Sequence, residues 1–266
     1  MLPRVLTIAG SDSGGGAGIQ ADLKTIGVLG GHGMSAITAV TAQNTVGVTG
    51  IRVLDRAFVR EQIETVVSDI GADAVKTGML ATAAIVDEVA SVIAESRLQP
   101  LVVDPVLAAE SGAGLVEDAV ASSLMARMIP LATVVTPNAV EAARLLGREV
   151  ACLEDQRAAA KAFVAAGAVS ALIKGGHLPG AESIDVLFAA GEIHEFAAAR
   201  LETKTTHGTG CTMAAAIAVY LGRGEDVPTS VARAKEFVTQ AIAGGLDLGG
   251  GAGPVNQFAG FDDDRD

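Results

Sequence analysis

The sequence predicts an α/β protein of three layers, in which helices cover both faces of a mostly parallel central sheet. Short apolar runs that suit strands alternate with longer periodic segments that suit helices along almost all of the 266 residues. Such alternation is typical of parallel strands joined by crossover helices. Half of the residues are apolar, which is enough to bury a large core. We therefore expect one domain over residues 1–266.

The expected strands are short and apolar, and glycine or polar residues end them. Residues 5–9 are rich in β-formers and stop at Gly10. A glycine follows Ala190 between two further strand-like runs, which predicts a hairpin there. The expected strands are residues 5–9, 33–42, 74–76, 101–103, 134–136 and 171–174, with the hairpin over 185–189 and 193–201.

The expected helices have recognisable starting residues. Asp55 and Thr82 suit the N-cap position of a helix, and Asn138 followed by Glu141 has the spacing of a capping box. The first helix closes at a pair of glycines. The expected helices are residues 18–29, 56–70, 82–96, 210–221 and 229–243.

Charge and cysteine content exclude several classes of function. Lysine and arginine total 19 against 31 for aspartate and glutamate, a formal charge of −12. A surface this acidic repels nucleic acid and anionic lipid, so we expect neither as a partner. Two cysteines form no disulfide framework, and no apolar run suits a leader or a membrane span, so we expect a cytoplasmic protein. The tail from residue 249 is rich in glycine and then acidic, and we expect it to be loosely ordered.

Several candidate residues follow the carboxyl ends of expected strands. Gly10, Asp104, Thr136 and Lys174 all occupy such positions. Ligands of open α/β sheets bind beyond those ends. We therefore expect the chemistry to cluster at one edge of the sheet.

The most informative segment is 205–211, with the sequence Thr-Thr-His-Gly-Thr-Gly-Cys before an alanine-rich helix. Gly208 and Gly210 allow backbone N–H groups to converge, and a helix start adds donors and partial positive charge, so the segment suits an anion such as a phosphoryl group. A helix N-terminus lowers the pKa of a thiol, so Cys211 could be a thiolate that takes a proton from an alcohol. A glycine-rich turn beside a buried, inert cysteine is the alternative, and the segment alone does not decide between them.

Three other features are weaker. Residues 10–22 form a glycine-rich loop in which Asp12 and Asp22 can accept hydrogen bonds, but its spacing fits neither a dinucleotide-binding loop nor a P-loop, and a tight turn is the alternative. Lys174 could reach a phosphate or could extend its amine into solvent at the sheet edge. Asp104 and Glu141 could help to hold Mg²⁺, although the capping box explains Glu141 equally well.

The order of these segments resembles one known family closely. The series is Gly10-Ser11-Asp12, Gln43-Asn44-Thr45, Lys76-Thr77-Gly78-Met79, Val103-Asp104-Pro105-Val106, Thr136-Pro137-Asn138 with Glu141, Lys174-Gly175-Gly176-His177 and His207-Gly208-Thr209-Gly210-Cys211. It resembles the hydroxymethylpyrimidine/phosphomethylpyrimidine kinases of thiamine biosynthesis, which are members of the ribokinase superfamily. The resemblance extends from Val5 to about Phe258.

The resemblance implies a fold, an activity and a set of roles. It implies a three-layer ribokinase-like sandwich, ATP as co-substrate with Mg²⁺, a homodimer, and two successive phosphorylations, of the pyrimidine's hydroxymethyl group and then of the monophosphate. The implied roles are catalysis for Cys211, Gly208, Thr209 and Gly210; substrate binding for Gln43, Gly10, Ala17, Asp22, Met79 and Val106; nucleotide binding for Lys174, Thr206 and His207; and metal binding for Asp104 and Glu141.

Two departures and three alternatives accompany the resemblance. The first loop has Asp12-Ser13-Gly14-Gly15 where the family often has Asp-Pro-Ser-Gly-Gly, and Glu110 stands where a lysine is common. A pyridoxal kinase of the same superfamily is the nearest alternative, but the amide of Gln43 suits a ring nitrogen beside an amino group. A non-catalytic ligand-binding regulator on the same fold and a sugar kinase are the others. The candidate catalytic residues disfavour the regulator, and the apolar Met79 and Val106 disfavour the sugar kinase.

Overall fold

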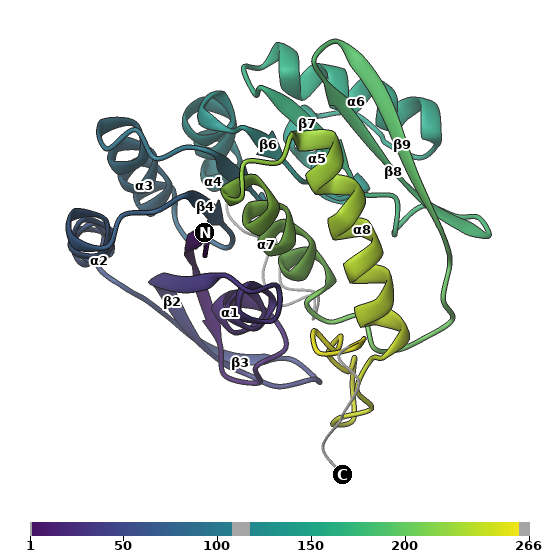
Figure 1. Cartoon of the computed structure of the whole chain (residues 1–266), viewed down its shortest axis with the longest axis horizontal. Coiled ribbons are helices and arrows are strands. Elements are labelled where there is room, and N and C mark those ends of the chain that lie inside the picture. Colours follow the sequence, from purple (N-terminus) through teal and green to yellow (C-terminus); the bar gives the residue numbers. More distant parts are fainter. Residues whose placement is uncertain (1, 108–117, 261–266) are drawn as a thin grey trace.

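A single mixed sheet forms the centre of the molecule (Figure 1). The structure is a computed structural model that describes residues 2–107 and 118–260. Within these ranges nine strands lie in the order β3-β2-β1-β4-β5-β6-β7-β8-β9. They are β1 (Arg4–Asp12), β2 (His32–Gln43), β3 (Val48–Val53), β4 (Ala74–Thr77), β5 (Leu101–Val103), β6 (Val134–Val135), β7 (Ser170–Ile173), β8 (Glu182–Ala189) and β9 (Glu192–Ala199).

Helices pack on both faces of the sheet (Figure 1). They are α1 (Gly18–Val28), α2 (Arg56–Asp69), α3 (Ala83–Glu95), α4 (Asp118–Ser123), α5 (Ala139–Leu146), α6 (Leu153–Ala165), α7 (Thr209–Gly222) and α8 (Val227–Ala243), with the short turns η1 (Leu124–Met128) and η2 (Ile129–Leu131). Helices α2 to α6 contribute to one apolar core, and α1, α7 and α8 contribute to a second core on the opposite face. Within the described ranges, no helix combines the length and apolarity that crossing a bilayer would require.

The predicted class is confirmed. Strands β2, β1, β4, β5, β6 and β7 run parallel to one another, whereas β3, β8 and β9 pair antiparallel at the two edges. The predicted hairpin joins β8 to β9, and both Ala190 (φ 50°) and Gly191 (φ 85°) adopt the positive φ values of a tight turn. No strand was predicted at β3, because this edge strand is mostly exposed and has no regular apolar alternation.

The predicted helix starts are also observed. The carboxylate of Asp55 accepts a hydrogen bond from the N–H of Ala57, and the hydroxyl of Thr82 accepts one from the N–H of Ile85. These bonds satisfy donors that a helix leaves unpaired in its first turn. The helices α2 and α3 therefore begin within a residue of their predicted positions.

The expectation of a loose tail is wrong for residues 249–260. His207 donates its backbone N–H to the carbonyl of Gly253 over 3.1 Å, and its own carbonyl accepts from the N–H of Val255 over 3.1 Å. Val255 is buried, and Asn256 donates to the carbonyl of Ala241 at the end of α8. The glycines allow this stretch to lie against the segment that precedes α7. The acidic residues 261–266 are outside the described part of the chain.

Candidate active site

The ends of three neighbouring parallel strands bring a lysine and an aspartate into contact. Asp104 follows β5, Thr136 follows β6 and Lys174 follows β7. The Nζ atom of Lys174 lies 2.9 Å from Oδ1 of Asp104, and the hydroxyl of Thr136 donates to the same oxygen over 3.2 Å. Asp104 is 2 % exposed. The adjacent strand ends therefore form a largely desolvated ion pair at the sheet edge.

The ion pair keeps Lys174 charged. Burial opposes the ammonium form, but the nearby carboxylates of Asp104 and Glu141 outweigh it, so the pKa of Lys174 is raised above its ordinary value. The Lys174 side chain remains 14 % exposed. A phosphate that binds here could therefore contact the ammonium of Lys174, which is already charged.

Glu141 forms the capping box of α5. The N–H of Asn138 donates to Oε2 of Glu141 over 2.8 Å, and the N–H of Glu141 donates to Oδ1 of Asn138 over 2.9 Å. The capping box therefore accounts for Glu141, and the charge of the same carboxylate also acts on Lys174.

The carboxylates at the strand ends fit a weakly held hard cation. In residues 2–107 and 118–260, no cluster of three or more His, Cys, Asp or Glu side chains could hold a metal ion. Mg²⁺ in phosphoryl-transfer sites binds through one or two carboxylates, with phosphate oxygens and water completing its shell. The pair of Asp104 and Glu141 matches that donor set, and it does not match a site for a permanently bound metal.

The turn before α7 is pressed against the first glycine-rich loop. Gly208 is the N-cap of α7, with φ 85° in the left-handed region. A Cβ atom at Gly208 would lie 1.9 Å from the carbonyl oxygen of Gly16, which no side chain tolerates. A Cβ atom at Gly210 would lie 3.1 Å from Nζ of Lys174 and 3.7 Å from Oδ2 of Asp104. Glycine is therefore required at position 208, whereas a side chain at position 210 would crowd the end of Lys174.

The start of α7 supplies donors beside that ion pair. The N–H of Thr209 donates to the carbonyl of Thr206, which also accepts from the Thr209 hydroxyl over 2.6 Å. The N–H groups of Gly210 and Cys211, which are the next in the first turn, have no acceptor within the helix itself. They carry the partial positive charge of the helix N-terminus. This end of α7 is therefore suited to an anion.

The surroundings of Cys211 favour a neutral thiol over the thiolate that the helix N-terminus allows. The side chain keeps part of its surface accessible, and the backbone N–H of Gly18 hydrogen-bonds to it. Loss of hydration raises the pKa of the thiol to about 12, and the neighbouring charge of Lys76 offsets this only in part. The helix N-terminus is outweighed because the surrounding protein removes the water that a thiolate needs.

A buried ion pair beneath Cys211 was not predicted. Lys76 on β4 and Asp22 on α1 are both fully buried, with Nζ of Lys76 2.8 Å from Oδ2 of Asp22. The hydroxyl of Thr7 also donates to Asp22 over 2.6 Å. The structure thus places Asp22, which the resemblance assigned to substrate binding, inside the core as the partner of Lys76. A lysine within the otherwise apolar strand β4 was the available signal, because a buried ammonium requires a partner.

The other predicted substrate residues lie around the ends of β1, β2 and β5. A Cβ atom on Gly10 would lie 2.4 Å from Cε of Met79, so the methionine packs directly on the glycine. The half-buried Val106 follows β5, and Ala17 donates its N–H to Oδ2 of Asp12 over 2.8 Å. Gln43 ends β2, and the Oε1 atom of its side-chain amide accepts a hydrogen bond from the hydroxyl of Thr41 over 3.1 Å.

His207 faces the glycine-rich loop. Its Nε2 atom lies 3.0 Å from Oδ2 of Asp12 and 3.4 Å from Nε2 of Gln43. Among the residues expected to bind nucleotide, Lys174 thus lies at the ion pair, His207 lies beside Gln43, and Thr206 is exposed. Glu110, where the family commonly has lysine, is outside the described residues.

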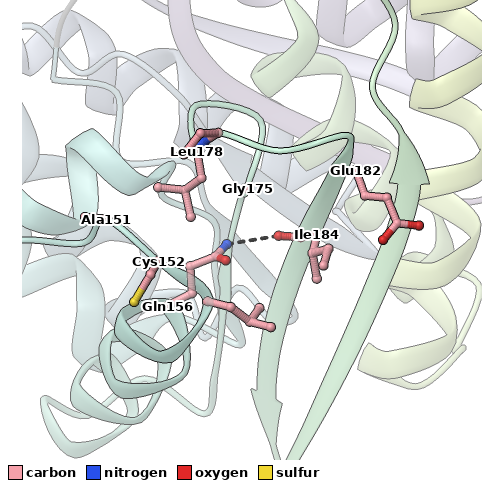
Figure 2. Close-up of a pocket in the computed structure, with 9 residues that line it drawn as sticks. Ala151, Cys152, Gln156, Gly175, Leu178, Glu182 and Ile184 are labelled. Carbon is pink, nitrogen blue, oxygen red and sulfur yellow. Dashed lines mark hydrogen bonds between the residues drawn. The ribbon is translucent and has the colours of Figure 1, made fainter.

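A separate cavity opens on the other side of the Lys174 strand end (Figure 2). Its volume is about 210 Å³, and it lies between the start of α6 and the loop that joins β7 to β8. The amide of Gln156 in its wall donates to the carbonyls of Ile173 and Ile184. Gly175 lines the cavity, but none of the predicted catalytic residues does. The cavity is therefore distinct from the cluster around Cys211.

Comparison with known proteins shows similarity to one enzyme family over nearly the whole chain. A family described as phosphomethylpyrimidine kinase matches residues 12–256. The hydroxymethylpyrimidine/phosphomethylpyrimidine kinase of Streptomyces coelicolor is 52 % identical over 254 residues, which cover 96 % of this chain and 94 % of that protein. A thiamine biosynthesis bifunctional protein of Geobacter sulfurreducens is 49 % identical over 98 % of this chain, but the chain spans only 54 % of its length.

Solved structures share the fold. A pyridoxal kinase of Bacillus subtilis in complex with ADP superposes with a TM-score of 0.91 at 38 % identity, covering 97 % of this chain and 98 % of the other. A phosphomethylpyrimidine kinase of Clostridium difficile gives a TM-score of 0.81 at 38 % identity, covering 90 % and 99 %. The two structures represent two substrate classes on one architecture.

Replacing Gly208 by alanine should damage the site far more than the same change at Gly191. Both glycines have φ 85°, but only Gly208 faces another backbone atom at close range. We expect Gly191→Ala to lower the free energy of unfolding by about 1–2 kcal/mol through backbone strain. Gly208→Ala should lower it by about 3 kcal/mol more because the turn must move away from Gly16. Urea denaturation measures both, and equal losses would show that the close contact with Gly16 is unimportant.

Cys211 should resist alkylation at pH 8, whereas the exposed Cys152 should react. The thiolate is the reactive form, and a pKa of about 12 leaves the Cys211 sulfur protonated until the pH approaches that value. We expect iodoacetamide to modify Cys211 at least ~100-fold more slowly than Cys152. Mass spectrometry of peptides after timed labelling gives both rates, and comparable rates would contradict the assignment of a neutral thiol.

Proposed function

The chain belongs to the phosphomethylpyrimidine kinase family, and we propose that it transfers the terminal phosphoryl group of ATP to 4-amino-5-hydroxymethyl-2-methylpyrimidine and then to the resulting monophosphate. The observation that carries the proposal is the glycine turn at 208–210, which sets the start of α7 against the Lys174–Asp104 pair. Curated relatives that are 52 % and 46 % identical over 96 % of the chain bear the name of this kinase.

The turn would stabilise the phosphoryl group during its transfer. Phosphoryl transfer spreads negative charge over the equatorial oxygens, and catalysis consists mainly of positioning and electrostatic stabilisation. The N–H groups at the start of α7 are fixed in position by the contact of Gly208 with Gly16. Because these donors are already oriented, little reorganisation is required when charge develops.

Lys174 and Asp104 would receive the nucleotide phosphates. Lys174 offers a charged ammonium at the mouth of the site, and Asp104 together with Glu141 would hold Mg²⁺. When bound, Mg²⁺ neutralises charge on the β- and γ-phosphates and orients them. The Lys174 side chain is partly exposed, so its ammonium would be able to turn toward a phosphate oxygen.

Cys211 would orient the accepting alcohol, because its thiol keeps its own proton and cannot take the proton of the alcohol. A neutral thiol with a high pKa cannot activate the alcohol by early proton removal. In a loose transition state the nucleophile needs little activation, because bond formation lags behind bond cleavage. The sulfur thus suits a supporting function in transfer.

The residues at the ends of β1 and β2 would select the substrate. Met79, Gly10 and Val106 offer an apolar wall for a flat ring, and Ala17 lies beside it on the glycine-rich loop. The amide of Gln43 can pair with a ring nitrogen and the adjacent amino group. Asp22 would act indirectly, because its ion pair with Lys76 fixes the position of that lysine.

Pyridoxal kinase activity is the alternative, because structures of pyridoxal kinases superpose closely on this chain. Both substrates are flat heteroaromatic rings with a hydroxymethyl arm. Sequence identity favours the pyrimidine, since the curated pyrimidine kinases reach 52 % and the pyridoxal kinase of Bacillus subtilis reaches 38 %. The amide of Gln43 favours it for a separate, chemical reason.

We also propose that the chain works in the cytoplasm as a homodimer. Strand β3 is a sheet edge that exposes Ile51 and Val53 at 44 % and 46 %, and an apolar edge strand favours pairing with another chain. Light scattering after size exclusion should give twice the mass of one chain, and the mass of a single chain would exclude the dimer.

Wild-type chain, Mg-ATP and hydroxymethylpyrimidine should yield ADP together with the pyrimidine monophosphate and then the diphosphate. Mass spectrometry of a time course identifies each product. We expect kcat/KM for the pyrimidine to exceed that for pyridoxal by at least ~10-fold, since a buried amide left without its partner costs on the order of 1–3 kcal/mol. Equal or reversed values would favour the pyridoxal kinase, and binding without ADP release would favour a regulator.

Cys211→Ala should lower kcat by on the order of 100-fold with little change in KM, because the sulfur contributes chiefly in the transition state. Cys152→Ala is the matched control, since that exposed cysteine lies on the α6 side, by the separate cavity. An unchanged kcat in the Cys211 variant would remove this residue from the reaction.

A further inference from the structure

Four segments that are far apart in the sequence come into contact at His207. It directly precedes Gly208 of the anion-binding turn, and its ring packs on Gly16, where a Cβ atom would lie 2.3 Å from the imidazole Cδ2. Its backbone bonds to residues 253 and 255 of the C-terminal segment. Its Nε2 atom faces Asp12 and Gln43. The side chain is 13 % exposed, so these contacts are shielded from solvent.

Asp12 determines that the Nε2 atom of the His207 imidazole carries a proton. Its carboxylate accepts hydrogen bonds from the N–H groups of Gly14, Gly16 and Ala17, and it is 4 % exposed. Burial opposes ionisation of Asp12, but the bonds from His207 and from this loop backbone outweigh it and lower its pKa. An ionised carboxylate can only accept, so Nε2 of His207, at 3.0 Å, carries a proton and donates it to Oδ2.

The proton on Nε2 leaves the amide of Gln43 available for a ligand. A protonated ring nitrogen cannot accept a hydrogen bond. The N–H₂ group of Gln43, whose nitrogen lies 3.4 Å from Nε2 of His207, therefore does not donate to the imidazole. The carbonyl oxygen of the same amide lies 3.1 Å from the hydroxyl of Thr41, which sets the direction of the amide. Without a donor at position 207, the carboxylate of Asp12 would have a vacant lone pair next to the amide, and Gln43 would be drawn toward it.

We infer that His207 is a positioning residue for substrate specificity. Its hydrogen bond to the carboxylate of Asp12 keeps the Gln43 amide free for the pyrimidine ring. The inference rests on the proposed function, and it deepens that function by assigning His207 to the acceptor substrate. It differs from the nucleotide contact that the family resemblance implied. The same residue connects the substrate side to the anion-binding turn, because Gly208 is its neighbour in the chain.

A matched pair of substitutions isolates the donor. His207→Gln keeps an amide N–H that can reach Asp12, and His207→Met keeps the bulk against Gly16 but has no donor. Each is made in the wild-type chain and in the Gln43→Ala background, and KM for hydroxymethylpyrimidine and for ATP is measured in all six proteins. Thermal melting confirms that each variant is folded.

The expected changes in KM would occur only if His207 acts through Gln43. His207→Met should raise KM for the pyrimidine on the order of 10-fold, because the ring loses an oriented partner. KM for ATP should stay within about twofold, and His207→Gln should stay within about threefold of wild type for both substrates. In the Gln43→Ala background, His207→Met should add less than about twofold, since the two changes remove one interaction.

Two results would contradict the inference about His207 without contradicting the proposed function. A rise in KM for ATP with an unchanged KM for the pyrimidine would make His207 a nucleotide contact. Fully additive effects of the two substitutions would show that His207 does not act through Gln43. Either result overturns the inference and leaves the kinase activity intact. Absence of pyrimidine turnover by the wild-type chain would instead overturn the proposed function and this inference together.

Discussion

The contact between Gly208 and the carbonyl of Gly16 is the constraint on which the site depends. It joins the loop after β1 to the turn before α7, and it leaves no room for a Cβ atom. With this contact in place, the first turn of α7 lies against Lys174 and Asp104, and Cys211 lies above Lys76. The donors of a helix N-terminus thus gain a fixed direction, which a free turn would not give them. In the proposed function, binding and catalysis would therefore depend on how closely these two backbones approach.

Two buried ion pairs prepare the electrostatics around that contact. Lys76 with Asp22 and Lys174 with Asp104 each place a lysine beside a carboxylate at 2.8–2.9 Å. The pairs differ in accessibility, since the first is fully buried and the second keeps a partly exposed ammonium. The first pair therefore shapes the surroundings of Cys211, whereas the second can exchange partners with an incoming phosphate. An isolated lysine at either place would lose its charge to burial, and an isolated carboxylate would repel the nucleotide.

The sequence was sufficient where the signal is local. The caps Asp55 and Thr82, the strand ends at Asp104 and Lys174 and the glycines of residues 208–210 were all identified from neighbouring residues, and their positions follow from a parallel sheet. Partners distant in sequence could not be identified, as Lys76 and Asp22 are 54 residues apart and His207 and Asp12 are 195 apart. The sequence left the protonation state of Cys211 open, because the helix N-terminus is visible in the sequence and the loss of hydration that raises the pKa of the thiol is not. Glycine content suggested a loose tail, but residues 253–255 bond to both sides of the His207 backbone. The family resemblance supplied roles, and the comparisons show the family, while the role of each residue stays a prediction.

A structure of the chain with ADP, Mg²⁺, aluminium fluoride and hydroxymethylpyrimidine would show whether the start of α7 binds the phosphoryl group, because aluminium fluoride imitates that group during transfer. We expect fluoride atoms within hydrogen-bond distance of the N–H groups of Gly210 and Cys211, with the sulfur of Cys211 facing the hydroxymethyl oxygen and Lys174 turned toward the phosphates. A fluoride group bound away from the start of α7, or a hydroxymethyl oxygen remote from that sulfur, would contradict this expectation.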